Sequence, residues 1–172
     1  MNYYINKTRE FRDMIGLVQP DEKTHSDMYQ SEARELDLAT TKAEAADALA
    51  DMVVVMSGWC VDFPEKEKDF PRFIEKMETL SEFNGVNLKA AFDIVNASNI
   101  TKICTEDEIT PTIIKYKKIG IKIEFKEPSD GIFVAYSVKD QWDEFSNDYP
   151  AGKMLKSINY QAPDWSGTEW QA

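Results

Sequence analysis

The sequence predicts a mainly α-helical fold, an antiparallel helical bundle with a small β-hairpin toward its C-terminal end. Apolar residues recur at three- and four-residue spacing between residues 3 and 100. Residues that start or stop helices, such as Pro20, Pro71 and Gly85, divide this pattern into segments. Strict alternation of apolar and polar residues appears only beyond residue 120, which is why one hairpin is expected there.

The spacing predicts helices over residues 3–14, 26–39, 41–61 and 71–84, then one that begins after Asn87 and runs through Val95. Thr110 and Pro111 predict a short helix that ends at Gly120. His25 follows a polar loop, residues 19–24, so we expect a surface or helix-start residue without a catalytic role.

Residues 121–125 and 132–137 predict the two strands, joined by a turn over 128–131. A two-stranded hairpin of this size is expected to lack a core of its own. We therefore expect a single domain over residues 1–172, in which residues 104–150 form an inserted short helix plus hairpin. Residues 151–172 are expected to form an extended tail.

Composition and charge narrow the function classes. The chain of 172 residues is 42% apolar, enough for a buried core, and carries a net charge of −11. That charge argues against nucleic acid or an anionic membrane as the main partner. Residues 1–7 do not resemble a signal peptide, no apolar stretch reaches the length of a membrane span, and Cys60 and Cys104 have no metal or disulfide spacing. We expect a cytoplasmic protein.

The helix over residues 41–61 carries the most informative pattern. As a helix it has one apolar stripe, made of Ala46, Leu49, Val53, Met56 and Cys60. Three acids, Glu44, Asp47 and Asp51, share the opposite side, and residues 45–61 contain no Lys or Arg to pair with them. Carboxylates among Ala, Val and Met are costly to desolvate, and a bound divalent cation would neutralise them.

Glu44 has two equally good interpretations. Thr41 and Glu44 fit a capping box at the helix start, and acids in a first turn suit the helix dipole. Metal binding explains the same residue as well. Asp51 lies beyond the first turn, so capping does not explain it.

A second acid pair, Glu32 and Glu35, lies on one face of the preceding helix. This pair is also typical of a solvated acidic face, supported by the neighbouring Arg34 and Asp37. A short turn at Thr40 brings the next helix back antiparallel, so the two acid pairs are predicted to face each other and to bind Mg²⁺ through oxygen ligands. Basic and polar residues further along could then contact phosphate, or be solvated surface groups: Asn99, Lys102, Lys153 and Lys156.

These motifs resemble a known family. The pairs Glu32-x-x-Glu35 and Glu44-x-x-Asp47 are similar to the ExxE…ExxD signature of the all-α nucleoside triphosphate pyrophosphohydrolases, the MazG-like and phosphoribosyl-ATP pyrophosphohydrolase-like group. Residues 92–102 and 152–160 resemble a subgroup that is common in bacteriophages. The gap between the acid pairs is short for this signature, and relatives often carry histidine where this chain has Asn96.

The resemblance implies Mg²⁺-dependent hydrolysis of a (d)NTP between the α and β phosphates, with Mn²⁺ as a substitute metal. The metal ligands would be Glu32, Glu35, Glu44, Asp47 and Asp51, and Glu32 or Glu35 would orient the attacking water. The implied substrate-binding residues are Asn96, Asn99, Lys102, Lys153, Lys156 and Tyr160.

The resemblance also implies a homodimer or homotetramer, in the host cytoplasm if the chain is phage-encoded. Two alternatives stay open at this point. One is a related enzyme for a special substrate, such as dUTP, phosphoribosyl-ATP or a guanosine alarmone. The other is a catalytically silent, oligomeric helical binding protein, against which the intact acids of both motifs count.

Overall fold

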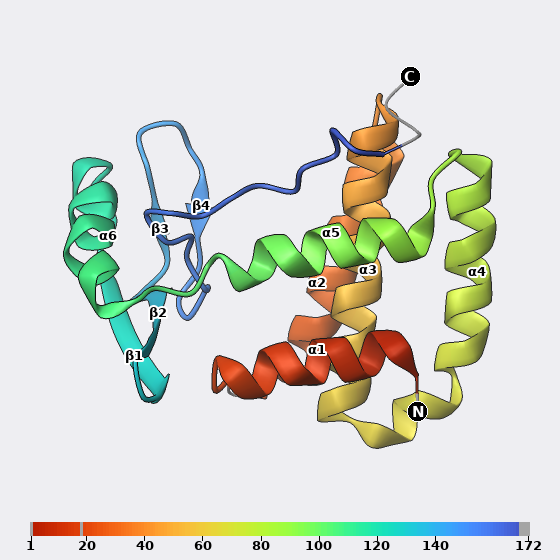
Figure 1. Cartoon of the computed structure of the whole chain (residues 1–172), viewed down its shortest axis with the longest axis horizontal. Coiled ribbons are helices and arrows are strands. Elements are labelled where there is room, and N and C mark those ends of the chain that lie inside the picture. Colours follow the sequence, from red (N-terminus) through yellow and green to blue (C-terminus); the bar gives the residue numbers. More distant parts are fainter. Residues whose placement is uncertain (1, 18, 169–172) are drawn as a thin grey trace. The chain divides into compact units, whose positions relative to one another are not determined.

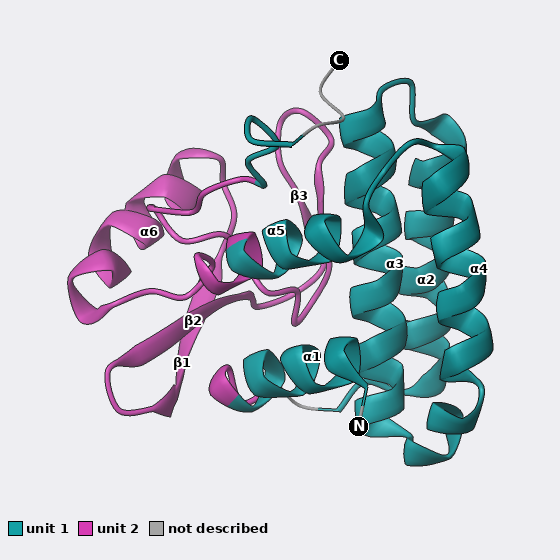
Figure 2. Cartoon of the chain, turned by 45° about the vertical axis from the view of Figure 1, so that its right-hand side comes forward, with its two compact units in different colours: residues 1–13, 17–97, 163–172 teal, residues 14–16, 98–162 magenta. Residues whose placement is uncertain are grey.

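A computed structural model describes residues 2–17 and 19–168, and it is mainly helical with a small antiparallel hairpin (Figure 1). The described chain divides into two compact units (Figure 2). The first unit comprises residues 2–13, 17, 19–97 and 163–168, and the second comprises 14–16 and 98–162. The mainly helical class and the hairpin confirm the prediction from sequence, and the two units are described separately below.

Five α-helices and one 3₁₀-helix make up most of the first unit. Their bounds are α1 Tyr3–Met14, α2 Glu22–Leu38, α3 Lys42–Asp62, the 3₁₀-helix η1 Pro64–Lys68, α4 Phe70–Phe83 and α5 Leu88–Ile100. α5 continues past Ala97 into the residues of the second unit. The predicted helices over residues 3–14, 41–61 and 71–84 agree with α1, α3 and α4 to within one residue.

α3 is the central element of this unit, because it is buried on more than one side. Leu49, Val53 and Cys60 are fully buried and pack with residues of α1, α4 and α5. Ala46 and Ala50 form a second cluster with Val86, Ala91 and Val95. The contact between α3 and α5 is thus made mainly by small side chains. The predicted apolar stripe is therefore correct, and residues of α3 outside the stripe are buried as well.

α2 begins four residues earlier than predicted. Asp21 is its N-cap, and its side chain accepts a hydrogen bond of 2.7 Å from the backbone N–H of Thr24. His25 therefore lies in the first turn of the helix, with only 1% of its surface exposed. His25 is therefore a helix-start residue, one of the two expected alternatives, but it is not on the surface. The helix starts inside the polar segment that was expected to be a loop.

The second unit contains one helix and four short strands: α6 Glu106–Lys118, β1 Ile123–Ser129, β2 Ile132–Ser137, β3 Gln141–Trp142 and β4 Asp148–Tyr149. β1 pairs antiparallel with β2 in a register that places Ile123 opposite Ser137. Gly131 in the connecting turn has φ +71°, a left-handed conformation that suits glycine. β3 and β4 form a second, smaller antiparallel pair that the sequence pattern did not predict.

The hairpin shares a buried core with α6 and with residues near 155. Tyr116 of α6, Ile121, Ala135 of β2 and Leu155 form a buried cluster. The backbone N–H of Leu155 donates to the carbonyl of Ala135 at 2.8 Å, so residues near 155 lie against β2. This third layer of chain supplies the apolar cover that two strands lack.

α6 begins at Glu106, four residues before the predicted cap at Thr110. The backbone N–H of Thr105 donates to Glu108 Oε2 at 2.9 Å, which is half of a capping box. Pro111 consequently lies inside the helix, where its ring is exposed to solvent. The carbonyl it leaves without an N–H partner belongs to the exposed first turn, and water can serve that carbonyl.

Within residues 2–17 and 19–168, no helix is long and apolar enough to cross a membrane.

Candidate functional site

The five predicted acids all lie on α2 and α3, which run side by side in the first unit (Figure 2). Residues 39–41 connect the two helices, and so short a connection reverses the chain. The tight loop required by the short gap between the two acid pairs is thus present. This short connection agrees with the predicted antiparallel arrangement of α2 and α3.

The acids differ in how far they are withdrawn from solvent. Glu32, Asp47 and Asp51 are half-buried, whereas Glu35 and Glu44 are exposed. Glu32 lies four residues before Leu36, which packs against the main core. Residues four apart share a helix face, so Glu32 lies toward the core side of α2. Asp47 and Asp51 are likewise one turn apart on α3.

Glu44 forms the capping box that its spacing with Thr41 predicted. Its Oε2 atom accepts hydrogen bonds from the Thr40 N–H at 2.8 Å, the Thr40 hydroxyl at 2.9 Å and the Thr41 N–H at 3.0 Å. These hydrogen bonds hold the pKa of Glu44 below its usual value, and the bond from the Thr40 backbone N–H has the largest effect. The carboxylate is therefore ionised at neutral pH, and a metal would have to be bound through Oε1.

The donor chemistry of these acids fits Mg²⁺, which takes oxygen ligands. In the described part of the chain, no three Asp, Glu, His or Cys side chains gather into a ready-made metal site. Mg²⁺ commonly uses only one or two carboxylates and completes its shell with substrate phosphates and water. The half-buried pair Asp47 and Asp51 fits that smaller requirement.

A second group of predicted residues meets in the second unit, where the end of α5 contacts residues 156–161. The ammonium of Lys156 lies 4.5 Å from the ring centroid of Tyr160, and the Ser98 hydroxyl donates to the Tyr160 hydroxyl at 3.2 Å. On the same helix end, Lys102 Nζ donates to Asn99 Oδ1 at 2.6 Å. The structure therefore links Lys156 and Tyr160 to the last turn of α5.

Hydrogen bonds that the sequence did not predict hold this segment in place. Ser157 Oγ donates to the Thr101 carbonyl at 2.8 Å, and Lys115 Nζ donates to the Ser157 carbonyl at 2.9 Å. Burial, with the neighbouring charge of Lys156, lowers the pKa of Lys115. Lys115 has no distinguishing spacing in the sequence, whereas Ser98 could have been singled out from the segment that carries the family resemblance.

The other two predicted substrate residues are Lys153 and Asn96. Lys153 Nζ donates to the Asp148 carbonyl at 3.0 Å and lies 5.8 Å from the ring centroid of Tyr149. Asn96 belongs to the first unit, where it is half-buried on α5. Asn96 lies three residues before Asn99 on the same helix, so the two share a face of α5.

The far end of α3 holds a buried ionic cluster that the sequence did not predict. Asp62 Oδ2 accepts hydrogen bonds from Arg12 Nη2 at 2.5 Å and from His25 Nε2 at 2.7 Å. The His25 ring stacks on Trp59 with a centroid separation of 5.7 Å. Burial lowers the pKa of His25, and the bond to Asp62 only partly opposes that effect. His25 Nδ1 is buried and has no hydrogen-bond partner among the described residues.

Neither protein-family models nor curated proteins match the sequence, and no solved structure matches the fold.

Proposed function

We propose that this chain is a Mg²⁺-dependent nucleoside triphosphate pyrophosphohydrolase of the all-α type, which converts a (d)NTP to the monophosphate and pyrophosphate. The observation that carries this proposal is the α2–α3 pair, which presents Glu32, Asp47 and Asp51 half-buried on two helices joined by a tight loop. Carboxylates held at this depth on facing helices supply the oxygen ligands that Mg²⁺ prefers.

A bound Mg²⁺ would supply charge stabilisation for the phosphate and would lower the pKa of an attacking water. Asp47 and Asp51 would hold the metal, with Glu44 Oε1 and Glu35 as further oxygen donors. Glu32 or Glu35 would orient the water for attack on phosphorus. Asn99, Lys102, Lys156 and Tyr160 would contact the phosphates or the sugar, as the family resemblance implies.

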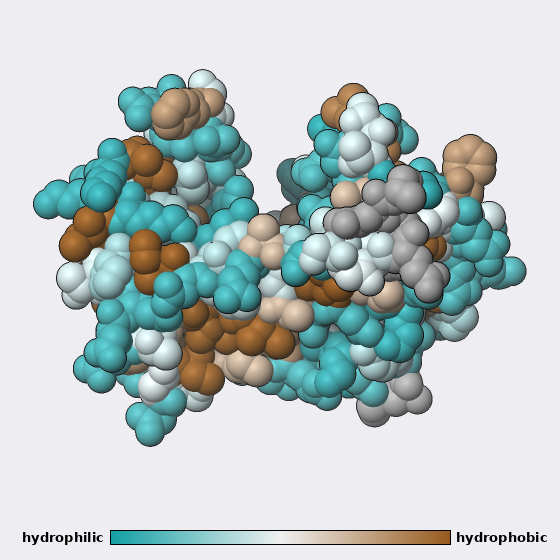
Figure 3. All heavy atoms as spheres, turned by 45° about the horizontal axis from the view of Figure 1, so that its top comes forward, coloured by the Kyte–Doolittle hydropathy of each residue, from teal (hydrophilic) through white to brown (hydrophobic). Residues whose placement is uncertain are grey.

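A homodimer or homotetramer in the cytoplasm belongs to the same proposal. Met28 and Leu38 on α2 are 45% and 77% exposed. Apolar patches also interrupt the mostly hydrophilic face shown in Figure 3. Cys60 and Cys104 are buried free thiols, and burial raises the pKa of Cys60 to about 11. Both thiols suit a reducing compartment.

The reaction is tested by incubating the protein with the eight common NTPs and dNTPs, with Mg²⁺ or with EDTA, and separating the products. Monophosphate plus pyrophosphate, formed only with Mg²⁺, is the expected result. Glu35→Gln and Asp47→Asn should each lower turnover by about 100-fold or more. Asp37→Asn, an exposed acid on the same helix as Glu35, is the matched control and should stay active.

Other outcomes separate the alternatives. Near wild-type turnover by Asp47→Asn would disprove the metal assignment. No product from any nucleotide would favour a special pyrophosphate substrate or a silent binding protein. Calorimetric titration with Mg²⁺ then distinguishes these two, because only an enzyme of this type needs the metal.

The phosphate contacts require a separate experiment. Lys102→Ala and Lys156→Ala should each reduce kcat/KM by about 10-fold or more, the usual effect of losing a hydrogen bond to a charged group. Lys118→Ala, an exposed lysine on α6, is the control. Unchanged kinetics for both variants would assign these lysines to the solvated surface.

A further inference from the structure

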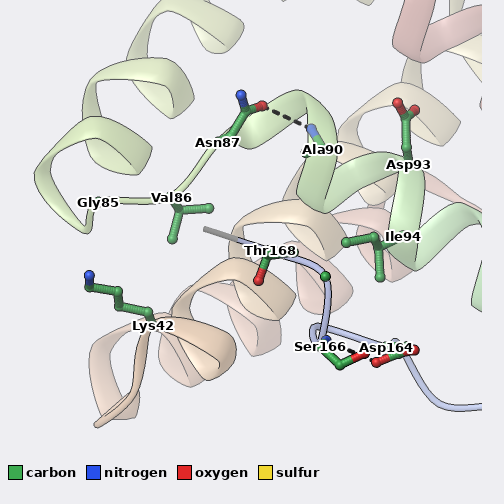
Figure 4. A pocket seen from close by; sticks show the side chains of 11 residues that line it. Lys42, Gly85, Val86, Asn87, Ala90, Asp93, Ile94, Asp164, Ser166 and Thr168 are labelled. Atoms are coloured by element: carbon green, nitrogen blue, oxygen red, sulfur yellow. Dashed lines mark hydrogen bonds between the residues drawn. The ribbon is translucent and has the colours of Figure 1, made fainter. Parts of the chain in front are cut away.

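The first unit contains a cavity of about 1040 Å³ that neither acid pair lines. Its walls come from the first residue of α3, the α4–α5 connection, the first half of α5 and residues 164–168 (Figure 4). The residues that line it are Lys42, Gly85, Val86, Asn87, Ala90, Asp93, Ile94, Asp164, Ser166, Gly167 and Thr168. The volume lies at the upper end of the range for small-molecule sites, so a bare ion would leave it nearly empty.

One end of the cavity presents hydrogen-bond donors and a positive charge. A Cβ atom on Gly85 would lie 3.6 Å from Lys42 Cε and 3.8 Å from its Nζ, so the amine of Lys42 extends across this glycine. The Lys42 ammonium forms no ion pair or hydrogen bond with any residue that the structure describes. Asn87 Oδ1 accepts the Ala90 N–H at 3.0 Å, which leaves the Asn87 side-chain N–H groups as donors.

The other end presents carboxylates. Asp93 and Asp164 lie on the side of the cavity away from Lys42 in Figure 4. The Asp93 carboxylate accepts hydrogen bonds from the Tyr3 hydroxyl at 2.5 Å and from Lys89 Nζ at 2.7 Å, so Asp164 is the main acceptor for a ligand at this end. Asp164 Oδ1 accepts the Ser166 N–H at 2.9 Å, and hydrogen bonds from Ser166 lower the pKa of Asp164. Asp164 is therefore ionised and keeps Oδ2 as an acceptor. Val86, Ala90 and Ile94 supply apolar wall between the two ends.

Residues 164–168 are held in place by a turn and by packing. The backbone N–H and the hydroxyl of Thr168 both bond to the Trp165 carbonyl, at 3.0 Å and 2.6 Å. The Trp165 side chain packs against the cluster formed by Ala46, Ala50 and Val95. These contacts fix residues 164–168 in position as one wall of the cavity.

We propose that this cavity binds a nucleoside phosphate, with the phosphates at Lys42 and Asn87 and the sugar or base toward Asp164. An anionic group fits the donor end, sugar hydroxyls or base amino groups fit the carboxylate end, and the apolar wall fits the flat faces of a base. The choice of a nucleotide rests on the function proposed above. Lys42 precedes Asp47 by five residues, about 7.5 Å of helix rise, so a phosphate chain held by Lys42 can extend along α3 toward its acids.

The test is calorimetric binding of the eight common NTPs and dNTPs in EDTA, so that no metal-dependent turnover occurs. At least one nucleotide should bind, and Lys42→Ala should weaken its binding about 10-fold or more. Asp164→Asn should change the ranking of the nucleotides, because it alters the acceptor at the base or sugar end. Lys68→Ala, an exposed lysine on η1 outside the cavity, should bind like the wild type.

Failure of this inference is distinguishable from failure of the proposed function. Nucleotide binding that is absent, or unchanged in Lys42→Ala, overturns the cavity assignment. If the wild type still hydrolyses a (d)NTP with Mg²⁺, the proposed function survives that result. Conversely, Lys42-dependent nucleotide binding without any turnover supports the proposed binding cavity and refutes the proposed hydrolase function.

Discussion

The two ends of α3 use acidic residues in opposite ways. At the C-terminal end, the Asp62 side chain is 7% exposed and bonds to Arg12 and His25 from two other helices. At the N-terminal end, Glu44 is exposed and bonds to the helix cap, and Asp47 and Asp51 are half-buried. An acid enclosed by cations from other elements holds those elements together. Acids on the rim of the core are reached by solvent, as the ligands of a metal must be.

Removing the enclosed acid should have the largest effect on stability. Asp62→Ala leaves Arg12 and His25 buried without their carboxylate, which should reduce the free energy of unfolding by about 3–5 kcal/mol. Urea unfolding followed by circular dichroism measures this change. Lys23→Ala, which breaks the exposed Lys23–Asp27 pair, is the control and should cost less than about 1 kcal/mol. Equal losses in the two variants would refute the contrast between enclosed and exposed acids.

A smaller loss is expected at the other end of the helix. The Thr41 hydroxyl accepts the Glu44 N–H at 3.2 Å, so Thr41→Ala removes one half of the capping box. The expected cost is about 1 kcal/mol in the free energy of unfolding. Thr79→Ala, an exposed threonine in the middle of α4, controls for loss of a hydroxyl. A loss as large as that of Asp62→Ala would mean that the cap is as important to the fold as the buried cluster.

The pH dependence of stability should also distinguish the two ends. The folded state lowers the pKa of His25 below its usual value near 6.5. The unfolded chain therefore binds the proton more readily just below pH 6.5, and protonation favours unfolding. The stability advantage of the wild type over His25→Gln should shrink between pH 7.5 and 5.5, as measured by urea unfolding at each pH. A constant or growing difference would contradict the neutral, buried histidine.

The smallest effect is expected for the rim acids in the absence of metal. Asp47 and Asp51 are like charges one helical turn apart, which repel by about 0.2–0.5 kcal/mol. Asp51→Asn relieves this repulsion and keeps a side chain of the same shape that still accepts hydrogen bonds, so the free energy of unfolding should change by no more than about 0.5 kcal/mol in EDTA. Thermal and urea unfolding of the variant in EDTA provide the measurement. A loss of 2 kcal/mol or more, on the order of a broken buried contact, would give Asp51 a structural role like that of Asp62.

Local sequence signals predicted most of the helices, and competing signals explain the errors. The Thr41 capping box and the glycine at residue 85 gave α3 and α4 nearly correct bounds. At α6, Thr110 and Pro111 suggested a helix start, but Thr105 and Glu108 offered an earlier one that the fold uses. Both residue pairs are typical of a helix start, and only tertiary packing determines which of them the helix uses.

The candidate sites also differ in how far local sequence predicts them. Spacing placed the acid pairs on two consecutive helices, and the structure joins those helices by a short loop. The buried cluster of Arg12, His25 and Asp62 was not predictable, because its members are 13 to 50 residues apart and come from three elements. The cavity was missed for a similar reason, since Lys42, Asn87 and Asp164 meet only after folding. Contacts of this kind depend on tertiary structure, which local patterns do not encode.

The short loop between α2 and α3 has a consequence for the order of folding. Contacts between elements that are neighbours in sequence require little loop-closure entropy, and they form early in a folding reaction. The α2–α3 pair meets this condition, whereas the wall formed by residues 164–168 requires the chain to return from far along the sequence. The acids on α2 and α3 should thus be brought together early on the folding pathway, before residues 164–168 complete the cavity.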